Sequence, residues 1–269
     1  MRIFWVAAAL VLMLPASTAV ADDFASCAQD DNANIKLTGC TRLLVAHPGL
    51  AAAYSSRGDA AASLGDTVGA ITDYTQAIAL DPKLAVAFYN RGLAHLAEAE
   101  ADLAAADFDQ AIALDGVDAT AYNGRAMANA AMGRPEAADA DFARAVALDP
   151  AYARAYLSRA TFNLRRGRFA AALADFDSVL RLHPGDQDAS LGRALAGQHA
   201  ALPDPEVAGS VTGSGAAGES PELDLGLAIP SQPAKGWLAR RARASRKHRD
   251  ALLPDAATGG PDLHIILNR

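Results

Sequence analysis

Apolar and small residues recur along the chain every 34 residues, in four aligned units at 51–84, 85–118, 119–152 and 153–186. The fourth and twenty-fourth places of each unit are aromatic, whereas the eighth and twentieth are Gly or Ala. Small residues let two helices approach closely and aromatic rings fill the space around that contact, so the pattern predicts two packed helices per unit. In unit order these places hold Tyr54, Phe88, Tyr122 and Tyr156 (fourth), Gly58, Gly92, Ala126 and Ala160 (eighth), Ala70, Ala104, Ala138 and Ala172 (twentieth), and Tyr74, Phe108, Phe142 and Phe176 (twenty-fourth).

The predicted helix ends fall in the same register. Proline cannot continue the hydrogen-bond ladder of a helix, and glycine is typical of turns. The residues that close successive second helices stand 34 positions apart and are Pro48, Pro82, Gly116, Pro150 and Pro184. The turn between the two helices of each full unit holds Gly65, Ala99, Gly133 or Gly167.

Together these positions resemble the tetratricopeptide repeat (TPR), a pair of antiparallel helices in every 34 residues. The resemblance implies an all-α fold, a right-handed α-solenoid in which stacked units share one elongated core, because no unit buries its apolar face alone. We expect about four full units and a degenerate first unit at 22–50, with its second helix at 32–48 and its first within 22–30. A cap helix is expected at 187–202, where Arg193 and Ala194 keep the register.

The first 21 residues have the layout of a secretory signal peptide. Arg2 precedes an apolar run from Ile3 to Leu14, and the small residues Ala19-Val20-Ala21 predict cleavage after Ala21. The apolar run is shorter than the roughly 20 residues that span a membrane, which disfavours the alternative of an uncleaved anchor. Arginine outnumbers lysine 20 to 4, as in proteins from GC-rich bacteria, so we expect an exported bacterial protein that is periplasmic or secreted.

Cys27 and Cys40 are the only cysteines. An even cysteine count in an exported chain predicts a disulfide, here one that fixes the short first helix of the degenerate unit. A redox-active pair would more often be spaced as C-x-x-C, which is absent. Closure of this short loop is expected to contribute about 3 kcal/mol to stability.

Charged residues also follow the repeat. The seventh place of every full unit is arginine and the twenty-third is aspartate, which predicts a ladder of pairs joining the two helices of each unit. The alternative is a basic stripe that binds anions; we favour the ladder because each arginine has its own carboxylate. The residues are Arg57, Arg91, Arg125 and Arg159, and Asp73, Asp107, Asp141 and Asp175.

The resemblance further implies that the first helices line a concave groove that binds peptide segments. Asn90 matches an asparagine of the carboxylate clamp of some relatives, but Thr120 and Gly124 replace its basic residues, so a clamp is not expected. Apolar side chains mixed with amides suit an extended peptide instead; an equally weighted alternative is that they pack between units. The candidate peptide-binding residues are Tyr89, Asn90, Leu93, Asn123, Met127, Arg154 and Leu157.

The C-terminal part has a different composition. Pro, Gly and Ser make up 14 of residues 203–233, which predicts a flexible linker over 203–234. Residues 235–249 hold seven basic residues beside Trp237 and Leu238, and 263–267 are apolar. Segment 235–269 is therefore either a solvated disordered tail or a basic segment that contacts an anionic membrane surface or cell-wall polymer.

Composition limits the functional classes. A net charge of -7 argues against a binder of duplex nucleic acid, and 6% aromatic residues argue against a β-sandwich. The six histidines are scattered, and the sequence shows no catalytic constellation, metal-ligand set or phosphate-binding glycine loop. We therefore expect no enzymatic activity and no cofactor, and an interaction module or scaffold for a protein or peptide partner. The alternative is a structural protein tethered to the envelope through its basic tail.

Overall fold

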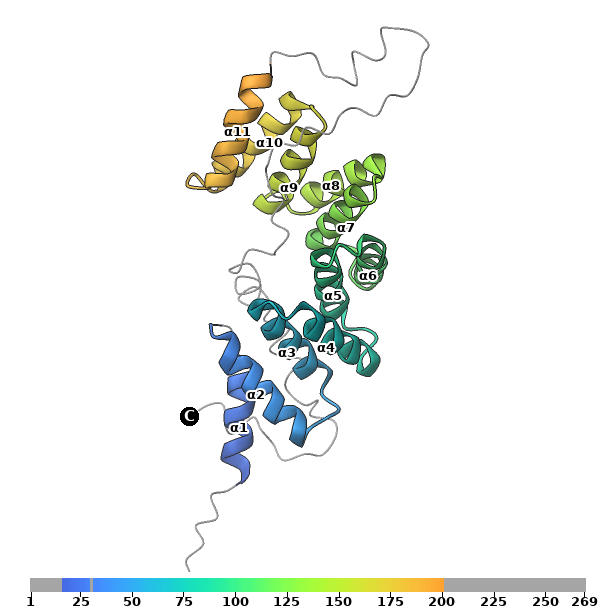
Figure 1. The fold of residues 1–269 in the computed structure, drawn as a ribbon, viewed down its shortest axis with the longest axis vertical. Helices are drawn as coiled ribbons and strands as arrows, with labels where there is room; N and C mark the ends of the chain where they lie inside the picture. The colour runs from blue at the N-terminus through green and yellow to red at the C-terminus, as the bar shows by residue number, and fades with distance from the viewer. Residues whose placement is uncertain (1–15, 30, 201–269) are drawn as a thin grey trace, which may run out of the picture.

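The computed structural model describes residues 16–29 and 31–200, and over these residues all regular secondary structure is α-helical (Figure 1). The predicted linker 203–234 and tail 235–269 lie outside the described residues, as do residues 1–15 of the predicted signal peptide. The helices are α1 (Ala16–Cys27), α2 (Ala33–Ala46), α3 (Ala51–Leu64), α4 (Thr67–Leu80), α5 (Ala85–Ala97), α6 (Ala101–Leu114), α7 (Ala119–Ala131), α8 (Pro135–Leu148), α9 (Ala153–Arg165), α10 (Phe169–Leu182) and α11 (Gln187–His199).

The helices follow the register of the repeat. Helices α3, α5, α7 and α9 begin at Ala51, Ala85, Ala119 and Ala153, the first residues of the four units. Helices α1 and α2 form the pair before them, and α11 follows as a single helix in the region expected for the cap. The prediction of an all-α solenoid is confirmed. One boundary differs, because α1 begins at Ala16 and continues across the predicted cleavage site after Ala21.

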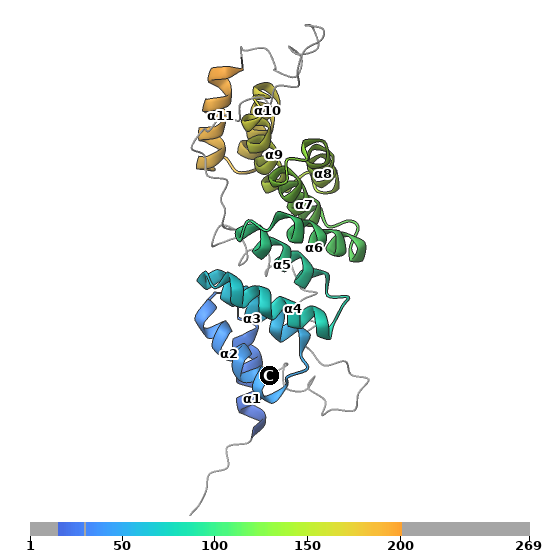
Figure 2. The ribbon, with the colours of Figure 1, turned by 45° about the vertical axis from the view of Figure 1, so that its right-hand side comes forward.

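Consecutive helix pairs stack along the long axis of the molecule (Figures 1 and 2). Each odd-numbered helix from α1 to α9 contacts the next odd-numbered helix, whereas the even-numbered helices make no comparable contacts with each other. The array therefore curves toward α3, α5, α7 and α9, and we call the surface that these four helices form the inner face. No helix in the described part of the chain is long and apolar enough to cross a bilayer.

Aromatic residues at the twenty-fourth place join one unit to the next. The side chain of Phe108 is fully buried between Gly92 of its own unit and Gly124 of the following one. A Cβ atom added to Gly92 would lie 3.0 Å from the ring, and one added to Gly124 would lie 2.5 Å from it. These close approaches explain why small residues recur on the first helices, because a larger side chain would push the units apart.

The predicted Cys27–Cys40 disulfide is present and joins the end of α1 to the middle of α2. Both cysteines are fully buried and pack against Leu43 and Ala53. Gly39 lies against the backbone of Cys27, so α1 and α2 touch closely beside the bridge. The disulfide thus holds α1, the outermost helix, on the body of the solenoid.

Candidate interaction face

Each full unit contains the predicted arginine–aspartate pair. Arg57 donates from Nε to Asp73 Oδ2 over 2.8 Å and from Nη2 to Asp73 Oδ1 over 2.6 Å. The carboxylates are buried, and each guanidinium also lies 5.4–5.8 Å from the centre of the aromatic ring at the fourth place. The same two-bond geometry recurs in Arg91–Asp107, Arg125–Asp141 and Arg159–Asp175.

The ladder also crosses between units. Arg125 Nη1 donates to Asp109 of the preceding unit over 2.6 Å, and Arg91 Nη1 donates to Thr75 over 3.0 Å. The hydrogen bond to Asp141 is the main cause that raises the pKa of Arg125 above its usual value, against the opposing effect of burial. Because these guanidinium groups are held by the protein's own oxygens, the geometry favours the ladder over an anion-binding stripe.

The seven candidate peptide-binding residues divide into two groups. Tyr89, Asn90 and Asn123 are buried, with exposed fractions of 2, 5 and 3%, and the Tyr89 ring packs 5.7 Å from that of Phe108. Asn90 donates from α5 to Asp59 on α3, so its side chain lies where these two odd-numbered helices meet. The other four are partly exposed on their helices: Leu93 on α5, Met127 on α7, and Arg154 and Leu157 on α9.

A polar network connects the first units beneath this face. Asp59 Oδ1 on α3 accepts hydrogen bonds from Tyr74 Oη and Asn90 Nδ2, each over 2.8 Å, and Lys36 Nζ on α2 lies 4.0 Å from Asp59 Oδ2. Burial, followed by the negative charge of Asp59, raises the pKa of Tyr74 well above its usual value. Sequence reasoning missed this network, although a tyrosine at the twenty-fourth place, where the other units have phenylalanine, was a signal for a local acceptor.

Two amide oxygens beneath the inner face have no hydrogen-bond partner in the described structure. Asn90 Oδ1 and Asn123 Oδ1 are both buried, on the neighbouring helices α5 and α7. The amide nitrogen of Asn123 makes only a weak contact, 3.7 Å from Met127 Sδ. A buried acceptor without a donor costs about 1–3 kcal/mol, so these two oxygens are a local cost to stability beneath the inner face.

The partly exposed side chains change in character along the inner face. Asp59 on α3 is acidic, and Arg154 on α9 is basic. Between them, α5 and α7 contribute the apolar side chains Val86, Leu93, Leu96 and Met127. The middle of the face is therefore apolar, whereas Asp59 is already engaged by Tyr74, Asn90 and Lys36.

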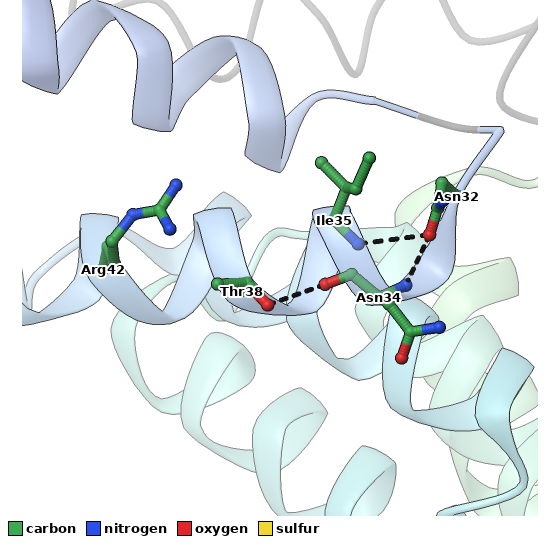
Figure 3. Close-up of a pocket in the computed structure, with 5 residues that line it drawn as sticks. All are labelled: Asn32, Asn34, Ile35, Thr38 and Arg42. Atoms are coloured by element: carbon green, nitrogen blue, oxygen red, sulfur yellow. Dashed lines mark hydrogen bonds between the residues drawn. The ribbon is translucent and has the colours of Figure 1, made fainter.

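An open recess beside α2 does not offer comparable binding chemistry (Figure 3). Its polar groups serve the protein's own fold: Asn32 Oδ1 accepts from the backbone nitrogens of Asn34 and Ile35, and Thr38 donates to the Asn34 carbonyl. Arg42, which completes the lining, donates to Asp23 over 2.6 Å. Nowhere in residues 16–29 and 31–200 do three His, Cys, Asp or Glu side chains lie together as a metal site would require.

Stacked antiparallel helix pairs with a shared inner face define the class of α-solenoid proteins. A family model described as TPR repeat matches residues 58–98. A second model, described as Tetratricopeptide repeat, matches residues 127–187 and 164–200. Over these matched residues the chain consists of tetratricopeptide repeats. The sequence matches no protein in a search of curated proteins.

Solved structures share this fold at low sequence identity. TTC0263, a thermophilic TPR protein from Thermus thermophilus, is 20% identical over 68% of this chain and 98% of its own, with a TM-score of 0.57. MamA 41-end from Desulfovibrio magneticus RS-1 is 21% identical over 64% of this chain and 97% of its own, with a TM-score of 0.56. A second MamA structure is 23% identical over 62% and 92%, with a TM-score of 0.53. At this identity the likeness concerns the fold.

Proposed function

We propose that this TPR protein is an exported scaffold that binds an extended segment of a partner protein on its inner face. The observation that carries the proposal is the set of partly exposed apolar side chains on α5 and α7, among them Leu93 and Met127. An extended peptide can cover such a surface, since it presents apolar side chains along its length. The burial of Tyr89, Asn90 and Asn123 makes them the support of this surface rather than its first contacts.

Export is supported by the N-terminal sequence and by the disulfide. Disulfides persist in oxidising compartments, and the Cys27–Cys40 bridge is fully buried at the outermost helix pair. We expect the protein isolated from the bacterial periplasm to begin at Asp22 and to contain no free thiol. Detection of a chain that still begins at Met1, with two reactive thiols, would contradict export.

Photo-crosslinking tests the binding surface. A benzophenone side chain in place of Leu93 is expected to capture a defined peptide segment, whereas one in place of Val68 on α4, which is 68% exposed, is expected to capture none. A Met127→Glu substitution should weaken the capture at position 93 at least tenfold, because it places a charge in the apolar middle of the face. Equal capture at positions 68 and 93 would rule out a specific inner-face site.

The basic residues of 235–249 support a second role as an envelope tether. Seven lysines and arginines beside Trp237 provide the charge and the apolar anchor that bind anionic surfaces. Co-sedimentation with anionic vesicles or peptidoglycan should then depend on these residues. Equal sedimentation of the wild type and of a full-length variant with all seven replaced by Gln would exclude the tether.

A further inference from the structure

Met127 lies in the apolar middle of the inner face, and its sulfur has two hydrogen-bond donors beside it. Asn123 Nδ2, one turn earlier on α7, is 3.7 Å from Met127 Sδ, and Ser158 Oγ on the next odd-numbered helix, α9, is 4.0 Å from it. A thioether sulfur is only a weak acceptor, so both contacts are weak. A stronger acceptor at the same place would bind both donors and link α7 to α9.

An oxygen atom on this sulfur would be such an acceptor. Oxidation of methionine to its sulfoxide turns an apolar side chain into a polar one. The oxygen would stand one bond length closer to the donors than the sulfur does, and so near the ordinary hydrogen-bond distance of about 2.7–3.2 Å. Met127 and Ser158 are both partly exposed, so a small oxidant can approach the sulfur from the side of α9. We infer that Met127 is a site of reversible oxidation, and that Asn123 and Ser158 hold its sulfoxide.

The reaction requires an oxidant of the peroxide class. With hydrogen peroxide, the O–O bond breaks and one oxygen atom forms a bond to Sδ. The proton of that oxygen moves to the leaving hydroxide, which departs as water, so the sulfur is oxidised by two electrons and the peroxide is reduced by two. Two thiols reverse the step, forming a disulfide and water. Methionine sulfoxide reductases carry out this reversal, one enzyme for each epimer of the sulfur.

Met132 provides a comparison at the end of the same helix. It is the C-cap residue of α7, and like Met127 it is partly exposed. Its side chain packs against the apolar cluster that contains Phe108 and Ala128. An oxygen on the Met132 sulfur would therefore lie beside carbon atoms and solvent, whereas one on the Met127 sulfur would meet two donors. The structure thus distinguishes two methionines of similar exposure.

Oxidation of Met127 would also change the binding surface. The sulfoxide places a polar, hydrated group on α7, between the helices that carry Leu93 and Leu157. An apolar partner segment would have to remove water from this group without replacing its hydrogen bonds, which lowers affinity. This consequence rests on the proposed function, whereas the preference for oxidation at Met127 does not.

Peptide mapping by mass spectrometry tests the site. The full-length chain is treated with a limiting amount of hydrogen peroxide, digested, and fragmented to locate the sulfoxide. We expect about fivefold more sulfoxide at position 127 than at position 132 in the folded chain, because hydrogen bonds favour the product at position 127. The two positions should react equally in urea. Equal reaction in the folded chain, or a preference for position 132, overturns the inference.

Variants of Ser158 test the role of the donors. Ser158→Ala removes one donor and should lower the yield of sulfoxide at position 127 about threefold, whereas Ser158→Thr keeps a hydroxyl and should retain it. The matched control is Ser190→Ala on α11, whose hydroxyl donates to the Asp186 carbonyl, and it should leave the yield unchanged. The same yield in all these chains overturns the inference.

The configuration of the sulfoxide gives an independent measurement. Because the donors hold the oxygen in one direction, one epimer should predominate at position 127 of the folded chain. One of the two epimer-specific reductases should then remove most of this sulfoxide from the digest, and the other should remove little. At position 132 the two enzymes should remove similar shares. Similar shares at position 127 would contradict the inference.

Photo-crosslinking from position 93 to a random peptide library separates this inference from the proposed function. Oxidation should lower the capture of apolar peptides about tenfold, whereas a Met127→Leu chain should capture them equally before and after peroxide treatment. Unchanged capture after selective oxidation overturns the effect on binding. No capture by the reduced chain would refute the proposed function, and the position and epimer of the sulfoxide would still decide whether Met127 is the oxidation site.

Discussion

Arg125 on α7 donates to Asp109 on α6 over 2.6 Å, and so ties one repeat unit to the preceding one. The same guanidinium is also held by Asp141 of its own unit. Asp109 has a side chain that is 56% exposed, whereas that of Asp141 is 9% exposed. One arginine thus pairs with an exposed carboxylate and with a buried one, so the contributions of the two ion pairs to stability can be compared directly.

Asp141→Asn is expected to lower the free energy of unfolding by about 2–4 kcal/mol, because it leaves a partly buried guanidinium without its carboxylate. Asp109→Asn is expected to cost less than about 1 kcal/mol, because exposed ion pairs are weak and screened by solvent. Urea titrations of both variants, followed by circular dichroism at 222 nm, measure the difference. Equal losses would show that burial does not set the strength of the ladder.

Ala99 is in the left-handed conformation, with φ of +61°, in the turn where the other three units have Gly65, Gly133 and Gly167. This conformation destabilises a non-glycine residue by about 1 kcal/mol, because its Cβ atom crowds the backbone. Ala99→Gly is therefore expected to raise the free energy of unfolding by about 0.5–1 kcal/mol. Ala174→Gly, in the exposed middle of α10, is the control with the opposite sign and should cost about 1 kcal/mol. A loss of stability in both variants would contradict this account of the turn.

Tyr74 is buried beside Asp59, and its pKa is raised well above 10 in the folded state. The unfolded tyrosine loses its proton near pH 10 while the folded one keeps it, so the unfolded state binds fewer protons above that pH. The stabilising effect of the neutral phenol is thus complete below pH 10 and declines as the pH rises toward the folded value. Chemical unfolding from pH 9 to 11 should show a smaller loss of stability in Tyr74→Phe than in the wild type. Parallel curves would mean that Tyr74 does not contribute to the decline.

Repetition made the fold predictable. Each place of the repeat occurs four times, so the recurring spacing of residues such as Gly58 and Tyr74 could be distinguished from a chance pattern. The pairing of Arg57 with Asp73 followed from the same spacing. The burial of Asn90 and Asn123 was less predictable, because it depends on how closely neighbouring odd helices approach, which no single unit specifies. The Asp59 network was missed for a related reason, since its members come from three different units.

The start of α1 was not predictable from the repeat either. The degenerate first unit lacks the recurring aromatic and small places, so its first helix had to be placed from the cysteines and from polarity alone. The structure extends that helix back to Ala16, where helix-favouring residues such as Ala19 and Ala21 continue. A cleavage signal and a helix use the same small residues, and sequence alone does not separate the two uses.

The contact between Gly124 and Phe108 predicts opposite effects for two glycine substitutions. Gly124→Ala would place a Cβ atom 2.5 Å from the Phe108 ring, and it is expected to cost about 1–3 kcal/mol because the ring is fully buried and cannot move freely. Gly197→Ala, on α11 with nothing within 4 Å of the added atom, is expected to gain up to about 1 kcal/mol from helix propensity. Thermal unfolding of both variants provides the test. If both substitutions were stabilising, helix propensity would dominate, and the small residues of the repeat would not be required for close packing between units.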